Sequence, residues 1–359
     1  MSSTIGKHIT VSVFGESHGP AIGMVMDNPP AGLKIDFDML LKEIDRRAPG
    51  NDPTATKRKE ADIPTFLSGI KEGVTTGAPI CAVINNTSQH SNDYSELKKK
   101  PRPSHADYAA NVHYKGFNDI CGGGHFSGRL TAPIVVAGAI LKQYLKQKGI
   151  TVGGHIFNIG SVYDTAFDRV NVNGGLLDSL SAKKFSVIDD LKEEEMRREV
   201  ESFRIKGDSV GGSVEIAVTG IKAGFGSPMF MGAENIITSA VFGIPAVKGI
   251  EFGAGFDFAN MCGSEANDQM YFENGEVRCY TNNNGGITGG ITNGMPIIFK
   301  VALKPTPSIA AEQKTVDLYE KGNTTLKIKG RHDPCIVPRA LPAVEAVTAI
   351  AIANLLKEF

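Results

Sequence analysis

The chain has 359 residues, of which 41% are hydrophobic and 21% charged, the balance of a globular protein with a sizeable core. Its formal net charge of −1 argues against a general nucleic-acid binder, which carries a basic excess. Five widely spaced cysteines without a Cys-x-x-Cys pair indicate reduced thiols in the cytoplasm, and exclude a zinc ribbon or a disulfide framework.

The first predicted elements are two strands and an amphipathic helix. A β-branched run at residues 11–14 ends in the polar cluster Gly15-Glu16-Ser17-His18-Gly19, and residues 21–26 continue as a second strand. Residues 36–47 place apolar side chains at i, i+3, i+4 and i+7 behind Asp36, the expected N-cap. The Ser-His pair is either catalytic or part of a well-formed turn, and the arginines of the last helical turn either bind a ligand or offset the helix dipole.

Two long polar loops follow, at residues 51–62 and 85–103, with short strands around 66–70 and 80–84 between them. Loops of this length inside a compact domain more often have a function than merely connect two elements. The second loop leads into Ser104-His105-Ala106-Asp107, where Ser104 is the expected cap of a short helix.

A glycine-rich loop, Gly122-Gly123-Gly124-His125-Phe126-Ser127-Gly128-Arg129, opens an apolar helix that runs to about Gln147. Backbone N–H groups at such a helix start attract anions, and Arg129 adds a fixed charge, although tight packing of the helix start is the alternative. The loop matches neither the P-loop nor the dinucleotide fingerprint. The apolar run within this helix, residues 132–141, is about half a membrane span, and the first residues of the chain lack the regions of a signal peptide, so we expect no membrane segment.

The second half of the chain mixes strands with helices. Residues 209–220 alternate apolar with small or polar residues, which predicts an antiparallel strand with one buried face. The last helix, residues 339–357, is so apolar that it must be buried within the subunit or between subunits. Further strands are expected at residues 150–159, 246–252 and 296–303, and further helices at 192–205 and 234–242. Irregular loops separate most strands, which favours an α+β fold with antiparallel sheets, in a single domain over residues 1–359, and disfavours a parallel Rossmann sheet.

The polar clusters combine histidines and arginines with few carboxylates. The neighbours of His18, His105, His125 and His332 are mostly basic residues or glycine, unlike the carboxylates that support metal-binding histidines, so no metal site is expected. A Ser-His-Asp hydrolase using Ser17 or Ser127 is conceivable, but neither serine lies in a G-x-S-x-G motif. The arginine excess indicates a ligand with carboxylates and phosphates.

Six ordered motifs resemble those of the chorismate synthase family, and the similarity runs from about residue 5 to residue 355. They are the Gly15–Gly19 and Gly124–Arg129 clusters together with Arg102-Pro103-Ser104-His105-Ala106-Asp107, Asn283-Asn284-Gly285-Gly286-Ile287-Thr288-Gly289-Gly290, Lys304-Pro305-Thr306-Pro307-Ser308 and Arg331-His332-Asp333-Pro334-Cys335. The resemblance implies the last step of the shikimate pathway, in which 5-enolpyruvylshikimate 3-phosphate loses phosphate and a ring proton in a 1,4-anti elimination to give chorismate. It also implies reduced FMN as cofactor, a β-α-β sandwich with helices packed between antiparallel sheets, and a homotetramer.

The resemblance implies a role for each matching residue. His18 protonates or stabilises the reduced flavin, His105 lies near the departing phosphate, and Asp333 helps to relay the substrate proton, while Ser17 and Ser127 hydrogen-bond at the same centre. The residues implied in substrate binding are Arg47, Arg102, Arg129 and Arg331. Those implied in FMN binding are His125, Phe126, Ser127, Pro245, Ala246, Gly289, Lys304, Pro305, Thr306, Pro307, Ser308 and Arg331.

Three positions depart from the family pattern. The family usually has arginine where His125 and Ala48 stand, and Pro53 stands where an arginine is often assigned to NADP contact. These departures imply weaker or pH-dependent binding of the FMN phosphate at residue 125, and dependence on an external source of reduced flavin in place of an intrinsic NADPH-dependent reductase activity. The alternatives are a non-catalytic binding protein for flavin or a phosphorylated metabolite, and a flavin-independent phosphate lyase that uses His105 and an aspartate base.

Overall fold

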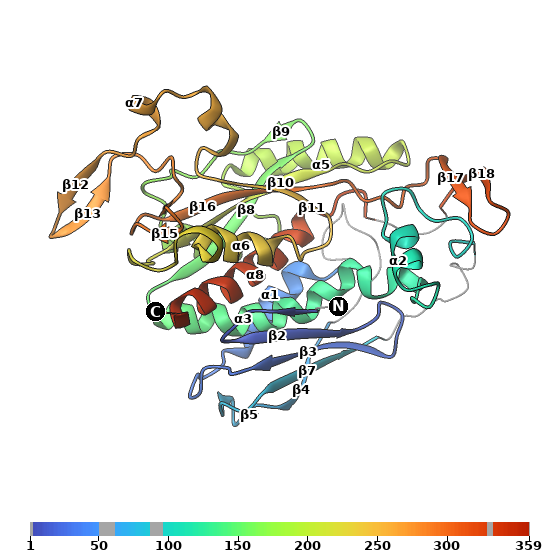
Figure 1. Ribbon diagram of the computed structural model, residues 1–359, viewed down its shortest axis with the longest axis horizontal. Coiled ribbons are helices and arrows are strands. Elements are labelled where there is room, and N and C mark those ends of the chain that lie inside the picture. The colour runs from blue at the N-terminus through green and yellow to red at the C-terminus, as the bar shows by residue number, and fades with distance from the viewer. Residues whose placement is uncertain (1–2, 50–61, 87–95, 329–332, 359) are drawn as a thin grey trace.

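Two five-stranded sheets enclose a layer of helices in the computed structural model, which describes residues 3–49, 62–86, 96–328 and 333–358 (Figure 1). The strand orders are β1-β2-β3-β7-β4 and β11-β16-β10-β8-β9, and neighbouring strands in both sheets are antiparallel. The first sheet comprises Thr4–Ile5, Thr10–Gly15, Ala21–Asp27, Ile80–Asn85 and Thr65–Ser68, in that order. The second comprises Val247–Phe252, Ile297–Leu303, Gly212–Thr219, Thr151–Ile159 and Val162–Tyr163. The expected α+β class and β-α-β sandwich are confirmed.

The helical layer between the sheets forms the core. Its members are α1 (Phe37–Arg47), α3 (Thr131–Gln147), α6 (Ala233–Val241) and α8 (Val337–Glu358). Asp36 caps α1 as predicted, since its carboxylate accepts a 3.0 Å hydrogen bond from the Met39 N–H. The helices α3 and α8 cross closely at Gly138, where a Cβ would lie 2.3 Å from the Cβ of Ala346.

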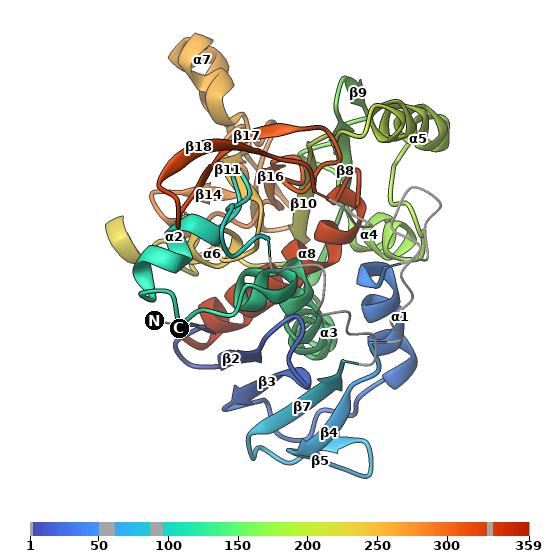
Figure 2. The same cartoon turned by 90° about the vertical axis from the view of Figure 1, so that its right-hand side faces the viewer.

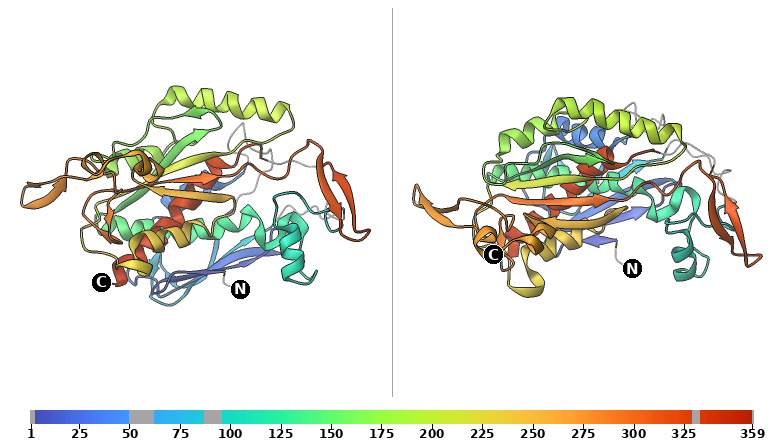
Figure 3. Two further views of the ribbon diagram at one scale, coloured as in Figure 1. Left: turned by 45° about the horizontal axis from the view of Figure 1, so that its top comes forward. Right: turned by 90° about the horizontal axis from the view of Figure 1, so that it is seen from above.

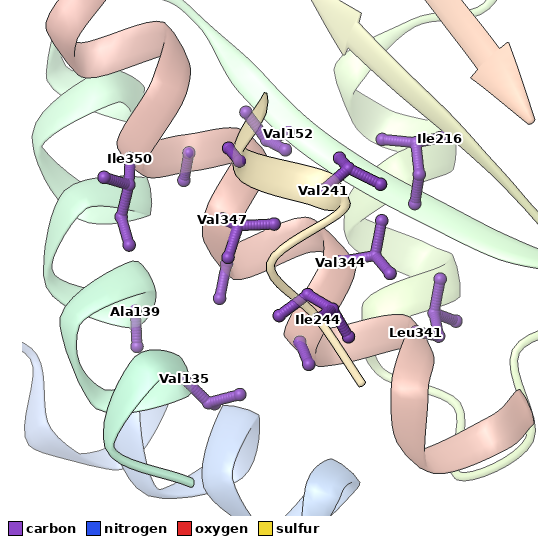
Figure 4. Close-up of a cluster of buried hydrophobic side chains, with 14 of the residues drawn as sticks. Val135, Ala139, Val152, Ile216, Val241, Ile244, Leu341, Val344, Val347 and Ile350 are labelled. Carbon is purple, nitrogen blue, oxygen red and sulfur yellow. The ribbon is translucent and has the colours of Figure 1, made fainter. Parts of the chain in front are cut away.

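The last helix is apolar because it is enclosed. By length and composition α8 could cross a membrane, but 83% of its most apolar window is buried inside the structure. Its side chains pack against α3, α6 and the inner face of the second sheet, as Leu341, Val344, Val347 and Ile350 show (Figure 4). This helix is therefore the core of the fold within one subunit.

The outer face of the second sheet is also covered, which corrects one expectation. The strand β10 was expected to bury one face, yet Glu215 and Ala217 are as buried as Ile216 and Val218. The helix α4 (Gly174–Ser181), which the sequence analysis did not predict, packs on this face and joins Ala217 in a second apolar cluster. The expected charged helix is confirmed as α5 (Asp190–Ile205), on the same outer side (Figure 3).

Short elements project from both ends of the sandwich. The hairpins β12–β13 and β17–β18 extend at opposite ends of the molecule (Figures 1 and 3). The remaining short strands are β5 (Ile70–Lys71), β6 (Val74–Thr75), β12 (Met270–Glu273), β13 (Glu276–Cys279), β14 (Ile287–Thr288), β15 (Ile291–Thr292), β17 (Gln313–Asp317) and β18 (Gly322–Leu326). The remaining helices and 3₁₀ turns are α2 (Asp107–His113), α7 (Gly263–Ala266), η2 (Cys121–Phe126), η3 (Gly128–Leu130), η4 (Met229–Met231) and η5 (Gly255–Asn260).

Candidate active site

The candidate site lies at the end of the sandwich that carries α2 and the β17–β18 hairpin, onto which Figure 2 looks. Several segments converge here: the turn after β2, the end of α1, the segment before α2, the glycine-rich loop before α3, the strap after β16 (residues 304–308) and the segment before α8. Residues far apart in the sequence are thus placed on rigid strand and helix ends, which is a favourable arrangement for a preorganised site.

The glycine-rich loop joins the two predicted catalytic histidines. A Cβ at Gly122 would lie 2.0 Å from His18 Nδ1, and one at the next residue, Gly123, 3.3 Å from His105 Nε2. Both glycines have positive φ, +62° and +88°, a conformation that disfavours other residues. Ser17 and Ser127 lie beside the same two glycines. The structure therefore brings Ser17, His18, His105 and Ser127 together, as the sequence predicted.

His105 is held by an arginine and a carboxylate from its own segment. The Asp107 carboxylate accepts hydrogen bonds from Arg102 Nε at 2.7 Å and Nη2 at 2.8 Å, and its Oδ1 lies 2.6 Å from His105 Nδ1. Burial alone would raise the pKa of Asp107, but the hydrogen bonds from Arg102 and His105 lower it far below its usual range. Asp107 is therefore an anion at working pH, and both Arg102 and His105 are oriented by it.

The expected helix cap at Ser104 is wrong. The helix α2 begins at Asp107 with Ala106 as its N-cap, and Ser104 has a φ of +59° in the turn before it. The carbonyl of Ser104 accepts a hydrogen bond from Lys304 Nζ. This contact from the distant strap after β16 fixes the turn, and a local capping rule cannot anticipate it.

Arg47 and Arg129 share a carboxylate that the sequence analysis missed. Asp62 Oδ2 accepts a hydrogen bond from Arg47 Nη1 at 2.7 Å, and its Oδ1 accepts one from Arg129 Nη1 at 2.6 Å. The Asp62 side chain is fully buried. Arg47 also donates to the Thr131 hydroxyl, and Arg129 to Asn86, so each guanidinium is fixed from two sides. The structure thus brings these two predicted substrate arginines together.

Asp333 is linked to the end of α1 through Arg339. Its carboxylate pairs with Arg339 Nη1, and Arg339 Nε donates to the carbonyl of Arg47 at 3.1 Å. Arg339 is a second residue that the sequence analysis missed. Among the predicted residues, Arg331 and His332, and the departing Pro53, lie outside the described residues, whereas Ala48 is the buried C-cap of α1.

The predicted FMN residues around Ala246 and Lys304 form one wall. The Lys304 N–H donates to the Ala246 carbonyl at 2.9 Å, and the Ser308 hydroxyl accepts from Arg102 Nη1 at 3.2 Å. Burial and the nearby Lys248 ammonium lower the pKa of Lys304. Thr306 Oγ1 is buried without a hydrogen-bond partner in the described part of the chain. The Lys304 and Lys248 ammonium groups lie close enough to repel each other, and such a pair of cations favours an anionic ligand.

Two predicted FMN residues, His125 and Gly289, are placed differently. His125 Nδ1 lies 2.8 Å from the Gly15 carbonyl and its Nε2 2.7 Å from Ser3 Oγ, so both ring nitrogens bond the protein. The next residue, Phe126, is 38% exposed, so its ring remains accessible to a ligand. Gly289 lies in the β14–β15 hairpin before β16, whereas Lys304 follows β16, a seven-residue strand of about 20 Å. The structure does not bring Gly289 together with the others within one chain.

Comparisons with known proteins agree over nearly the whole chain. The chorismate synthase family model matches residues 9–356. The chorismate synthases of Pyrococcus abyssi and Thermococcus kodakarensis are 46% and 45% identical, each over 97% of this chain and 96% of the relative. That of Methanobrevibacter smithii is 43% identical over 99% of this chain and 96% of its own length. A solved crystal structure of a chorismate synthase superposes with a TM-score of 0.76 and 27% identity, covering 98% of this chain and 93% of that one.

Proposed function

The chain belongs to the chorismate synthase family, a family of lyases of aromatic amino acid biosynthesis, and from this premise we propose its reaction in detail. The protein eliminates phosphate from 5-enolpyruvylshikimate 3-phosphate in a 1,4-anti sense to give chorismate, which makes it a carbon–oxygen lyase acting on phosphates. The observation that carries this proposal is that His18 and His105 lie beside two consecutive glycines, Gly122 and Gly123. Two buried arginines approach from separate segments, since Arg102 Nη2 lies 3.1 Å from His105 Nδ1 and the Arg129 N–H donates to Ser127 Oγ at 3.4 Å.

The substrate carries carboxylates and a phosphate, and the site offers matching cations. Arg47, Arg102 and Arg129 are each less than a tenth exposed, and each is held by hydrogen bonds to other parts of the protein. Fixed guanidinium groups in a shielded place suit charged oxygens better than mobile ones. We assign substrate binding to these arginines together with Arg331, which lies outside the described residues. Losing one such contact should raise the barrier by about 2–4 kcal/mol.

His105 is placed to act as the acid for the departing phosphate. Its Nδ1 faces Asp107, and its Nε2 faces the glycine-rich loop. An imidazole switches between charged and neutral forms near neutral pH, as this step requires. His18 provides the acid and charge partner on the flavin side, Asp333 helps to relay the ring proton of the substrate, and Ser17 and Ser127 hydrogen-bond beside them.

The residues present fit reduced FMN. When bound, the reduced flavin supplies the electronic chemistry for breaking the carbon–oxygen bond. Lys304 and its neighbour Lys248 offer positive charge to a phosphate, and the buried Thr306 hydroxyl, which has no hydrogen-bond partner among the described residues, offers a further hydrogen-bonding group. The residues that would hold the flavin are Phe126, Ser127, Pro245, Ala246, Lys304, Pro305, Thr306, Pro307 and Ser308.

Gly289 belongs to the predicted flavin set but lies at the far end of β16. Because about 20 Å of strand separates Gly289 from Lys304, we assign the contact of Gly289 with the flavin to a neighbouring subunit. This geometry supports the homotetramer that we propose for the protein. We also propose a single domain over residues 1–359, a cytoplasmic location and an external source of reduced flavin.

Anaerobic turnover tests the proposed reaction. We expect chorismate to form from 5-enolpyruvylshikimate 3-phosphate with chemically reduced FMN, and no chorismate to form with oxidised FMN and NADPH alone. His18→Ala and His105→Ala should each lower turnover at least about tenfold while the far-UV circular dichroism is kept. A non-catalytic binding protein would perturb the flavin absorbance without releasing phosphate. The proposal would be overturned if there were no turnover and no perturbation of the flavin absorbance when substrate and reduced FMN are both present.

A further inference from the structure

A single carboxylate links two residues of the proposed site. Asp107 is 7% exposed, and its two oxygens contact the Arg102 backbone N–H at 3.0 Å, Arg102 Nε at 2.7 Å, Arg102 Nη2 at 2.8 Å and His105 Nδ1 at 2.6 Å. Both oxygens are therefore committed to groups that the reaction uses. Neither composition nor the resemblance to the family assigned Asp107 a role.

The contact with Asp107 determines which nitrogen of His105 carries a proton. A carboxylate can only accept, so Nδ1 must be the donor in the 2.6 Å contact. The nearby Arg102 Nη2, at 3.1 Å from the same nitrogen, also only donates, and one of its two hydrogens goes to Asp107 Oδ1 at 2.8 Å. The contact of Nδ1 with the carboxylate is shorter, at 2.6 Å against 3.1 Å, and charge-assisted, so it determines the role of Nδ1. The ring is then fixed with Nε2 toward Gly123, since a Cβ there would lie 3.3 Å from Nε2.

We propose that Asp107 is a positioning residue that keeps a proton on His105 Nδ1 and fixes Arg102 beside it. The imidazolium form of His105 then gives its Nε2 proton to an oxygen of the departing phosphate and is left as the neutral Nδ1–H tautomer. This inference rests on the proposed function for the identity of the leaving group. A histidine oriented by a carboxylate on one nitrogen and working through the other follows the same logic as the hydrolase triad. Ser308 completes the arrangement, because its hydroxyl accepts from Arg102 Nη1 at 3.2 Å and fixes the other edge of the guanidinium.

The test replaces Asp107 with its neutral isostere. In Asp107→Asn the amide nitrogen can donate to His105 Nδ1, which forces the opposite tautomer. We expect kcat to fall at least about 100-fold, by analogy with the loss known for the same change in the hydrolase triad, with a smaller change in KM. The ¹⁵N spectrum of histidine-labelled protein above neutral pH should show the His105 proton on Nδ1 in the wild type and on Nε2 in the variant.

A second buried pair supplies the matched control. His155 Nδ1 lies 2.8 Å from Asp164 in the second sheet, with both side chains fully buried, so Asp164→Asn makes the same chemical change away from the proposed site. We expect this control to lower stability while kcat of the folded protein stays within about twofold.

Each outcome decides the proposal. Wild-type turnover in Asp107→Asn, or an equal loss of kcat in Asp164→Asn, would overturn it. So would a wild-type His105 that carries its proton on Nε2, and this measurement does not require that the variant fold. If the wild type shows the Nδ1–H tautomer but does not act on 5-enolpyruvylshikimate 3-phosphate, the proposed function fails and the orientation of His105 stands.

Discussion

A buried carboxylate in the middle of the helical layer allows a quantitative prediction. Glu345 of α8 is fully buried and binds Arg46 of α1 through two contacts, Nη1 to Oε2 at 2.8 Å and Nη2 to Oε1 at 3.0 Å. It also binds Lys142 of α3, and Glu43 completes the network through contacts with both cations. One carboxylate thus joins the three helices, and α1 ends at the next residue, Arg47.

The contribution of the ionised Glu345 carboxylate to the free energy of unfolding follows from its pKa. Burial alone would raise the pKa, but the Arg46 and Lys142 charges and hydrogen bonds lower it from 4.5 to about 2. Because the pKa is lower in the folded state, the stabilisation is present above about pH 4.5 and is lost as the pH falls toward about 2. A shift of that size corresponds to roughly 3 kcal/mol at neutral pH, within the range of about 3–5 kcal/mol for breaking a buried ion pair.

Chemical denaturation of Glu345→Gln measures this quantity. At neutral pH and equal protein concentration we expect a free energy of unfolding about 3 kcal/mol below the wild type, and a difference that shrinks on acidification. Glu193→Gln breaks an exposed i,i+4 pair with Arg197 on α5 and should change stability by less than about 0.5 kcal/mol. A loss below about 1 kcal/mol for Glu345→Gln, or one that grows as the pH falls, would refute the reasoning.

Three further predictions concern the site. Gly122→Ala places a Cβ 2.0 Å from His18 Nδ1, so turnover should fall at least about tenfold, while Gly263→Ala, which meets no described atom within 4 Å, should keep wild-type rates in the same assay. Asp62→Asn removes the charge between two buried arginines, so it should lower the free energy of unfolding by about 3 kcal/mol and raise KM. If both values stay unchanged, the ion pairs of Asp62 with Arg47 and Arg129 do not orient the site. His125→Gln keeps a donor and an acceptor, so the ratio of FMN to riboflavin affinity, measured by titration, should stay constant; a fall in that ratio would make residue 125 a phosphate contact.

The elements that the sequence predicted correctly are those determined by nearby residues. The helix α1 has its apolar stripe and its Asp36 cap within one short segment, and both are found. Ser104 has the right residue type for a cap, but Lys304, two hundred residues away, holds its carbonyl in a left-handed turn. The second buried face of β10 was missed because α4, which covers it, begins Gly174-Gly175 and has no strong helical signal.

In the candidate site, too, contacts between residues close in sequence could be predicted and contacts between distant residues could not. Arg102, His105 and Asp107 lie within one motif, and the spacing of the carboxylate from the arginine was a usable signal for their pairing. Asp62 gave no such signal, since it is one carboxylate in a charged stretch. Its partner Arg47 lies 15 residues before it in the sequence and its partner Arg129 lies 67 residues after it. Long-range ion pairs of this kind depend on how the helices and loops pack, which periodicity does not report.

The pairing of the arginines explains how a site for a polyanion can exist in a folded protein. A buried guanidinium without a partner destabilises the fold by several kcal/mol, yet complete neutralisation would remove the attraction for the substrate. Within the described residues, Asp62 contacts both Arg47 and Arg129, and Asp107 contacts Arg102. These carboxylates orient the arginines that we assign to the substrate. For this reason Asp62→Asn and Asp107→Asn should both weaken the site, although each change makes it more positive.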